Sequence, residues 1–340
     1  MATRGARPAE GALRGTARHV PVLLPQVVQA LSPAAGESYI DATFGAGGYS
    51  EAILAAAPAT RVLGIDRDPA ATAAGRAIAD RQQGRLTLVE GRFGDLDRIA
   101  EEAGFAPADG VVLDIGVSSM QLDDPARGFS FQADGPLDMR MSSSGPTAAD
   151  VLNTAEEALL ADILFHLGDE RSARAIARAI VADRGKRQLT RTLELASLVA
   201  RVLGREKIAG RHAATRTFQA LRIYINDELT ELARALSAAE RVLAPGGRLV
   251  VVAFHSLEDR LVKQFLKARA MPEEQGSRHL PPKAGGRPPS FRFVNHRPLS
   301  PTDKEIAANP RARSARLRSA VRTEAPAWEE DLGDLPLPRL

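Results

Sequence analysis

A glycine-rich turn between two apolar segments is the part of this sequence best suited to chemistry. Tyr39-Ile-Asp-Ala-Thr-Phe-Gly-Ala-Gly-Gly-Tyr49 is followed by Val62-Leu-Gly-Ile-Asp66. This order predicts a strand, a tight turn, a helix and a second strand that ends in a carboxylate. Gly47 and Gly48 lack a Cβ, so the backbone can turn sharply and approach a ligand closely. Asp66 follows about 20 residues later, where a carboxylate can bind two ribose hydroxyls. The pattern therefore predicts a nucleoside-binding site.

Two nucleoside cofactors are compatible with such a turn. A nicotinamide dinucleotide needs the G-x-G-x-x-G spacing and a free helix N-terminus for its pyrophosphate. Here Ser50 occupies the third glycine position, and Asp41 precedes the turn, where it would repel a pyrophosphate. S-adenosylmethionine has no phosphate, and a carboxylate suits its amino or sulfonium end. We predict S-adenosylmethionine and keep two alternatives, the dinucleotide and a turn that only packs strand on helix.

Other residues with chemical potential follow the remaining predicted strands. In a doubly wound sheet, ligands bind beyond the carboxyl ends of the strands. Phe93 follows the third strand, where adenine needs an apolar wall, although a plain core phenylalanine fits the spacing equally well. Asp114 ends the fourth strand, where it could accept a hydrogen bond from an attacking amine; a solvent-exposed aspartate is the alternative. His255 follows the fifth strand and could polarise a substrate or only cap the next helix.

The elements that must position these residues alternate along the first 115 residues. Strands are predicted at 38–42, 61–65, 86–89 and 110–115, and helices at 25–31, 48–56, 69–81 and 95–103. Such alternation is typical of βαβ units and a parallel sheet.

The alternation then stops and resumes about 130 residues later. The segment 116–145 is loop-like, and residues 147–213 show only helical patterns, with apolar residues at helical spacing. Another helix is predicted over 218–229, a buried strand over 243–254 and a helix over 257–270. The segments 272–290 and 323–340 are predicted to be loop and disordered tail. A helical block is therefore predicted between the fourth and fifth strands.

Composition excludes several functional classes. The 340 residues contain no cysteine, which removes disulfides, thiolate metal sites and cysteine nucleophiles. No apolar run approaches the roughly 20 residues of a membrane span, and the N-terminus lacks an apolar signal core. No ligand cluster stands out among the six histidines. We expect a cytoplasmic protein with no membrane contact and no metal.

Basic residues are concentrated in two segments, although the net charge is only +3. Residues 169–222 hold thirteen Lys and Arg against five acids, and residues 278–322 hold eleven against two. Such blocks favour a polyanion partner such as nucleic acid, with solvated helix faces as the alternative. Candidate substrate contacts are Arg171, Arg174, Arg216, Arg222, His255, Arg311, Arg313, Arg316 and Arg318. Candidate stacking partners for an unpaired base are Phe129, Phe131 and Phe254.

Short motifs in a fixed order run through nearly the whole chain. They include His19-Val-Pro-Val-Leu-Leu, Asp41-Ala-Thr-Phe-Gly-Ala-Gly-Gly-Tyr-Ser, Leu113-Asp-Ile-Gly-Val-Ser-Ser, Gly128-Phe-Ser-Phe, Gly135-Pro-Leu-Asp-Met-Arg-Met, Gly168-Asp-Glu-Arg, Thr215-Arg-Thr-Phe-Gln-Ala-Leu-Arg-Ile, Phe254-His-Ser-Leu-Glu-Asp-Arg and Asn309-Pro-Arg-Ala-Arg-Ser. Each is weak alone. Together, over about residues 19–322, they resemble the bacterial ribosomal small-subunit RNA methyltransferase H family, also called MraW.

The resemblance implies a function and a site. It implies methylation of the exocyclic N4 of a cytidine, cytidine 1402, in 16S rRNA of the small ribosomal subunit, with S-adenosylmethionine as donor. The implied donor contacts are Gly47, Gly48, Tyr49, Asp66, Phe93, Asp114 and Gln121.

The resemblance also implies a class I methyltransferase with a Rossmann-like, doubly wound α/β sheet and an inserted all-helical domain. We expect the methyltransferase domain at 19–135 and 214–322 and a substrate-recognition domain at 136–213. Residues 1–18 and 323–340 are expected to be disordered tails.

The chemistry of a cytosine amine is consistent with these residues. Its lone pair is delocalised into the ring, so catalysis consists of positioning and of a hydrogen-bond acceptor for the amine. Asp114 is our candidate for that acceptor. Methylation at ring carbon five would need a cysteine nucleophile, which the chain lacks. Alternatives are a methyltransferase for a protein or small molecule, and a non-catalytic RNA-binding assembly factor. The sequence leaves the oligomeric state open, a homodimer included.

Overall fold

The computed structural model describes residues 21–208, 211–271, 287–329, 335, 337–338 and 340. The tail predicted at 1–18 lies outside this range, as does most of the loop predicted at 272–290.

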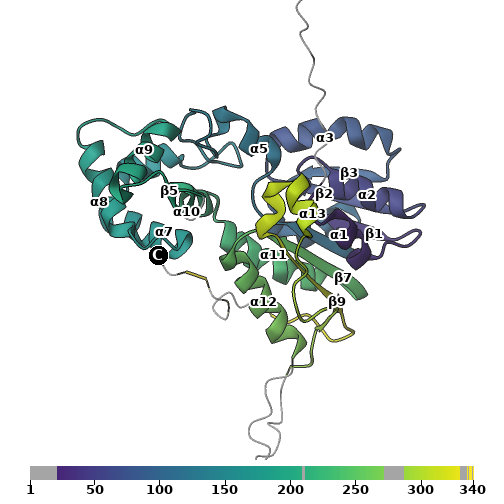
Figure 1. Cartoon of the computed structure of the whole chain (residues 1–340). Coiled ribbons are helices and arrows are strands. Elements are labelled where there is room, and N and C mark those ends of the chain that lie inside the picture. Colours follow the sequence, from purple (N-terminus) through teal and green to yellow (C-terminus); the bar gives the residue numbers. More distant parts are fainter. Residues whose placement is uncertain (1–20, 209–210, 272–286, 330–334, 336, 339) are drawn as a thin grey trace, which may run out of the picture.

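One sheet of seven strands organises the described chain, in the order β3-β2-β1-β4-β7-β9-β8. The strands are β1 (Ser38–Asp41), β2 (Arg61–Asp66), β3 (Leu86–Glu90), β4 (Ala108–Asp114), β7 (Leu243–Ala253), β8 (Phe291–Phe293) and β9 (Arg316–Arg322). The first five of these pair in parallel, whereas β9 is antiparallel to both of its neighbours. This is the predicted Rossmann-like α/β sheet (Figure 1), with β8 and β9 added at an edge that the sequence analysis did not anticipate.

Helices cover both faces of the sheet, because neighbouring strand residues point to opposite sides. Tyr39 packs with α1 (Leu24–Leu31) and α2 (Gly48–Ala56), beside α3 (Pro69–Arg81). Ile40 packs with α4 (Leu96–Ala103), α11 (Glu228–Val242) and α12 (Ser256–Ala270) on the other face. Both side chains are at most 1% exposed. The parallel strands are therefore fixed from both sides, which places their carboxyl ends firmly at one rim.

The inserted block forms a second core beside the sheet (Figure 1). It contains α6 (Ala148–Thr154), α7 (Glu157–Gly168), α8 (Ala173–Arg184) and α9 (Thr192–Leu203). α10 (Thr215–Asn226) contributes Phe218 and Leu221 to the same core, although the sequence boundary at 214 assigns it to the other domain. The segment 147–213 is not wholly helical, because β5 (Lys207–Ile208) and β6 (Arg211–His212) form a short antiparallel hairpin.

Two further differences from the sequence prediction concern a boundary between two helices and the C-terminal segment. The helix predicted over 218–229 is interrupted at Asp227, whose φ of 50° ends α10 and begins α11. Residues 323–329, expected to be disordered, pack against the protein. The backbone N–H of Trp328 donates to Glu240, and its ring lies 5.1 Å from the Arg269 guanidinium.

In the described part of the chain, we find no helix long and apolar enough to cross a membrane.

Candidate active site

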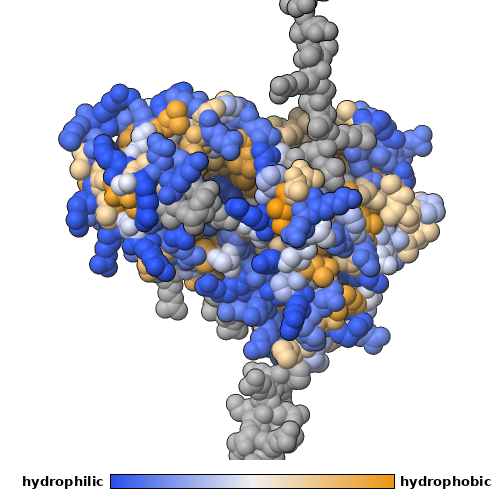
Figure 2. All heavy atoms as spheres, in the orientation of Figure 1, coloured by the Kyte–Doolittle hydropathy of each residue, from blue (hydrophilic) through white to orange (hydrophobic). Residues whose placement is uncertain are grey.

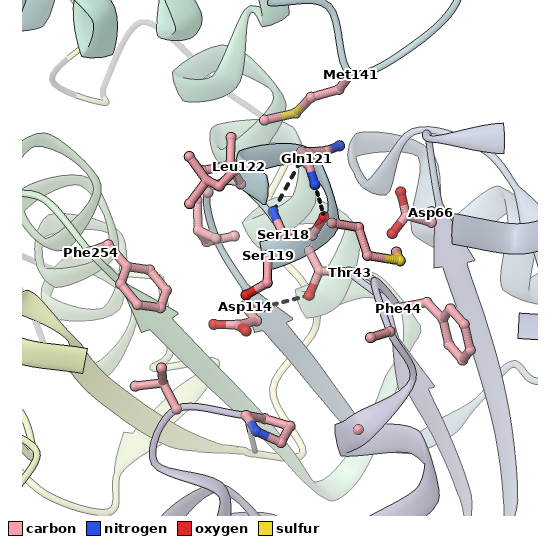
Figure 3. Close-up of a pocket in the computed structure, with 18 of the residues that line it drawn as sticks. Thr43, Phe44, Asp66, Asp114, Ser118, Ser119, Gln121, Leu122, Met141 and Phe254 are labelled. Atoms are coloured by element: carbon pink, nitrogen blue, oxygen red, sulfur yellow. Dashed lines mark hydrogen bonds between the residues drawn. The ribbon is translucent and has the colours of Figure 1, made fainter. Parts of the chain in front are cut away.

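A pocket of about 400 Å³ lies at the carboxyl ends of β1, β2 and β4 (Figure 3). Six of the seven predicted donor contacts line it: Gly48, Tyr49, Asp66, Phe93, Asp114 and Gln121. Gly47 does not line this pocket. The rule that strand ends converge therefore located these residues correctly in space.

Close packing within the protein requires the two glycines of the turn. Gly47 has a φ of 78° at the N-cap of α2, and a Cβ on it would lie 2.8 Å from the Phe44 ring. A Cβ on Gly48 would lie 2.3 Å from Pro21, which itself lines the pocket. The Tyr49 hydroxyl donates to the carbonyl of Val22 in the same segment. The turn therefore holds residues 21–22 as a pocket wall. The sequence analysis had explained the two glycines by close approach of the backbone to a ligand.

Asp66 is held by backbone donors. Its Oδ2 accepts from the Gly45 N–H at 2.7 Å, and its Oδ1 accepts from the Asp68 N–H at 2.8 Å. Burial raises its pKa, and these two hydrogen bonds oppose that effect. A carboxylate has about four lone-pair sites, so acceptor capacity remains for a ligand in the pocket.

Gln121 is fixed within a small helix that the predicted loop 116–145 did not include, α5 (Ser119–Asp123). Its amide oxygen accepts from the Ser118 N–H at 3.0 Å, and its amide nitrogen donates to Asp68 at 2.8 Å. Arg127 donates to the same Asp68 oxygen at 2.7 Å. Asp68, two residues beyond Asp66, therefore ties the α5 wall of the pocket to the end of β2.

Asp114 has an unusual environment. Its Oδ1 is buried without a hydrogen-bond partner in the described residues, while its backbone N–H donates to the Thr43 hydroxyl at 2.7 Å. Burial, followed by the charges of Asp41 and Glu258, raises the pKa of Asp114 well above its usual value. Asp114 is thus half-buried at the pocket wall, with one oxygen buried, unlike the exposed aspartate considered as an alternative.

Asp41 differs from its predicted role as a direct donor contact. It is fully buried, is not among the pocket-lining residues, and accepts from the Ser50 hydroxyl at 2.7 Å. Burial raises the pKa of Asp41 to about 6. Its influence on the pocket is therefore electrostatic, through Asp114.

A second cavity of about 780 Å³ adjoins the pocket. Phe254, which is labelled at the first pocket in Figure 3, lines both and so forms a shared wall. Four of the predicted substrate contacts line the second cavity: Arg216, His255, Arg313 and Arg316. Arg222 and Arg311 line the first pocket, and Arg171 and Arg174 line neither. Hydrophilic side chains dominate the face of the molecule shown in Figure 2.

Buried charges lie directly behind the shared wall. Glu258 is fully buried, and its Oε2 accepts from the backbone N–H of Phe254 at 2.8 Å and of His255 at 3.2 Å. Its Oε1 lies 2.8 Å from His255 Nε2. Arg222 donates to both carboxylate oxygens of Glu228 at 2.7 Å and lies 4.0 Å from Glu258. Burial alone would raise the pKa of Glu258, but His255 and Arg222 hold it below its usual value.

This cluster changes the interpretation of two predicted substrate residues. The guanidinium of Arg222 is engaged with Glu228 rather than open to a phosphate. His255 caps α12, since its Nδ1 accepts from the Glu258 N–H at 3.5 Å, as the alternative interpretation had it.

Glu228, His255 and Glu258 are also close enough to form a metal site, which the sequence did not reveal. Arg222 already provides positive charge beside them.

Four further candidates are occupied elsewhere. Arg318 is 9% exposed and pairs with Asp259 through two hydrogen bonds. Phe129 lies in the core of the helical domain and Phe131 packs against it; neither lines the pocket or the second cavity, whereas Phe254 lines both. Arg311 lines the first pocket but pairs with Asp123 on α5.

Comparison with known proteins agrees with this geometry. The model of the MraW methylase family matches residues 16–323. The chain belongs to the MraW methylase family. It is a methyltransferase with a Rossmann-like fold, and its methyl donor is S-adenosylmethionine.

Similar proteins span almost the same length. "Ribosomal RNA small subunit methyltransferase H" of Methylobacterium nodulans is 57% identical over 93% of this chain and 94% of the relative. The protein of the same name from Xanthobacter autotrophicus is 56% identical over 98% of this chain and 96% of the relative. Among solved structures, a putative rRNA-methylase from Clostridium thermocellum covers 90% of this chain and 99% of its own, at 13% identity and a TM-score of 0.42. A likeness at that score adds nothing to the family assignment.

Proposed function

We propose that this methyltransferase modifies the exocyclic N4 of a cytidine in 16S rRNA of the small ribosomal subunit, in the cytoplasm. The names of its relatives support a small-subunit ribosomal RNA substrate, and the family resemblance points to cytidine 1402. The observation that carries the proposal is Phe254, which lines both the pocket and the arginine-rich cavity. An unpaired base stacked on this wall would lie beside the donor pocket, with its backbone among the arginines.

The residues of the first pocket fit S-adenosylmethionine. Asp66 offers lone pairs to ribose hydroxyls, and Phe93 offers apolar surface to adenine. The buried, unpartnered Oδ1 of Asp114 needs a hydrogen-bond donor, because buried polar atoms are rarely left without one. Gly48, Tyr49 and Gln121 complete the proposed donor contacts; Gly47, also expected from the resemblance, lies outside the pocket lining. The bound donor supplies an electrophilic methyl group on a positively charged sulfur.

Asp114 is proposed to act on the acceptor amine. A cytosine amine gains nucleophilicity as it becomes tetrahedral, and a carboxylate that accepts its N–H stabilises that geometry and then takes the released proton. The raised pKa of Asp114 shows that its surroundings disfavour the charged form. A positive charge on a bound ligand nearby favours the ionised form, so ligand binding would prepare the carboxylate for its role.

Arginines of the second cavity are proposed to hold the RNA backbone. Arg313 is exposed and has no hydrogen bond or ion pair to any described residue, and Arg216 and Arg316 lie in the same cavity. Arg171 and Arg174 are exposed on the inserted domain. Such contacts position RNA without reading its sequence.

The test is methyl transfer from tritiated S-adenosylmethionine to small subunits that lack the modification, followed by nucleoside analysis. We expect label in N4-methylcytidine. Label in another nucleoside would contradict the proposed atom. Tight donor binding without incorporation would favour a protein or small-molecule substrate, or a non-catalytic RNA-binding role.

A further inference from the structure

The outward face of α12 carries three cations that the proposed mechanism does not use. Arg260, Lys263 and Lys267 are exposed and follow one another at i, i+3 and i+7, so they share one face of the helix. The opposite face is buried against the sheet and includes Leu261 and Phe265. The helix is thus anchored on its apolar side and presents a continuous positive stripe on the other.

No described acidic residue compensates this stripe. Arg260, Lys263 and Lys267 have neither a hydrogen bond nor an ion pair within the part of the chain that the structure describes. Neighbouring arginines differ: Arg269 on the same helix pairs with Glu240 at 3.0 Å, and Arg318 beside it pairs with Asp259 at 2.7 Å. The stripe is therefore available to an external anion, whereas the buried arginines serve the fold.

The stripe is continuous with the second cavity. Ser256, the first residue of α12, lines that cavity and lies one turn before Arg260 on the same face. An α-helix rises about 1.5 Å per residue, so positions 256 to 267 span roughly 16 Å. Figure 1 shows α12 running away from the junction between the sheet and the inserted helices. A polyanion that leaves the cavity at Ser256 would meet the three cations in succession.

We infer that the outward face of α12 binds the phosphate backbone of the substrate RNA on one side of the target nucleotide. This inference rests on the proposed function. The remaining outward positions are Gln264 and Ala268, so the face lacks the large apolar side chains with which interfacial helices enter a membrane. Charge alone favours RNA, because phosphate contacts need only cations at suitable spacing.

The experiment compares two triple variants with the wild-type enzyme. One is Arg260→Gln, Lys263→Gln, Lys267→Gln, and the control is Arg76→Gln, Arg81→Gln, Arg98→Gln, which removes the same charge from exposed positions on α3 and α4. The affinity for unmodified small subunits is measured over a range of salt concentrations, together with donor affinity and kcat. Each lost phosphate contact reduces the slope of log affinity against log salt by about 0.7 to 0.9.

For the α12 variant we expect the slope to fall by about 2 to 3 and the KM for subunits to rise about tenfold or more at moderate salt. Donor affinity and kcat at saturating subunits should match the wild type. An unchanged slope, or an equal loss in the control variant, would overturn the inference. Loss of binding to anionic lipid vesicles with unchanged subunit affinity would also overturn it. If the wild-type enzyme does not methylate subunits at all, the proposed function fails instead, which is a distinguishable result.

Discussion

At the scale of single residues, the pocket is shaped by carboxylates that the fold removes from water. Asp41 and Asp114 lie at the ends of adjacent strands, and burial raises the pKa of both; the charge of Asp41 adds to this effect at Asp114, and the charge of Asp66 adds to it at Asp41. Asp66, at the end of the next strand, is instead stabilised by two backbone donors. The three side chains are chemically identical, so their different environments decide which can bind ribose and which can exchange a proton.

Replacing the Asp114 carboxylate tests its role directly. Asp114→Asn keeps the shape of the side chain but removes the charged acceptor, so we expect single-turnover methyl transfer to fall by about 10²- to 10³-fold. Donor affinity and subunit affinity are measured in parallel. Asp162→Asn, at an exposed position on α7, serves as the control. Near-normal turnover in both Asp114→Asn and Asp114→Ala would refute the proposed role.

The buried Asp41 predicts a specific pH dependence of stability. Because its folded pKa is raised to about 6, the folded protein binds more protons than the unfolded chain between about pH 4 and 6, and stability falls as pH rises through that window. In Asp41→Asn this loss is absent. Relative to the wild type, the free energy of unfolding of the variant should therefore increase by about 2 to 3 kcal/mol from pH 4 to pH 6 and then remain level. The free energies of unfolding of both proteins are measured by denaturant titration. A constant difference between them from pH 4 to pH 6 would show that the carboxylate is not perturbed as described.

At the scale of elements, the turn from β7 into α12 is built around one buried carboxylate. One oxygen of Glu258 accepts hydrogen bonds from the backbone N–H groups of Phe254 and His255, and its other oxygen faces the His255 ring. These contacts hold the wall between pocket and cavity. Glu194 plays the same capping role on α9, accepting from the backbone N–H groups of Thr190 and Arg191, but it lines neither the pocket nor the cavity.

Comparing alanine variants of these two glutamates distinguishes the contribution of Glu258 to stability from its contribution to the reaction. Glu258→Ala leaves Arg222 and His255 short of a buried partner, so we expect a loss of about 3 to 5 kcal/mol in the free energy of unfolding. At a temperature where the variant remains folded, we also expect at least a tenfold slower single-turnover rate with unchanged donor affinity. Glu194→Ala should lose only about 1 kcal/mol and keep its rate. Equal rates in the two variants would mean that Glu258 serves the fold alone.

Much of this architecture could be predicted from the sequence, and the exceptions have physical reasons. The buried strands β4 and β7 are long apolar runs, and the predicted helices follow clear periodicity. β8 has three residues, and β9 alternates arginine with small or apolar residues, so neither carries the signal of a buried parallel strand. The break at Asp227 depends on one left-handed residue, which helical periodicity does not reveal.

Within the candidate site, the sequence predicted correctly only the positions of residues that follow the ends of strands. The pocket proposed for the donor follows that rule, because parallel strands bring their carboxyl ends to one rim. The roles of Asp68, Arg222 and Glu258 depend on partners distant in sequence, such as Arg127 with Asp68 and Arg222 with Glu258. Charge type alone could not distinguish the buried Arg318 from the exposed Arg313.

At the scale of the whole molecule, two cores meet at the site. The sheet domain supplies most of the pocket proposed for the donor, whereas both units line the second cavity: Asp169 and Arg216 lie on the helical side, and His255, Arg313 and Arg316 on the side of the sheet. The Ser256 hydroxyl donates to Asp169 at 3.4 Å across this junction. The donor would therefore be held mainly by the sheet domain and the RNA by both units, with the reaction at their boundary.

This division predicts different salt responses for the two ligands. RNA binding through several arginines should weaken steeply between about 50 and 200 mM salt, by tenfold or more, since counterions are released on binding. Donor affinity should change little, because the donor carries both signs of charge and has no phosphate. Filter binding of small subunits and calorimetry of the donor measure the two. Subunit binding that is flat over this range would argue against phosphate contacts.

The most direct test of the account is the single-turnover rate of N4-methylcytidine formation in Phe254 variants, with donor affinity measured alongside. If Phe254 is the wall on which the target base stacks, Phe254→Ala should slow methyl transfer about 10- to 100-fold, in line with about 1 to 3 kcal/mol for base stacking. Phe254→Tyr, which keeps the aromatic face, should retain most of the rate, and both variants should bind the donor normally. An undiminished rate in Phe254→Ala would contradict the claim that pocket and cavity form one active site.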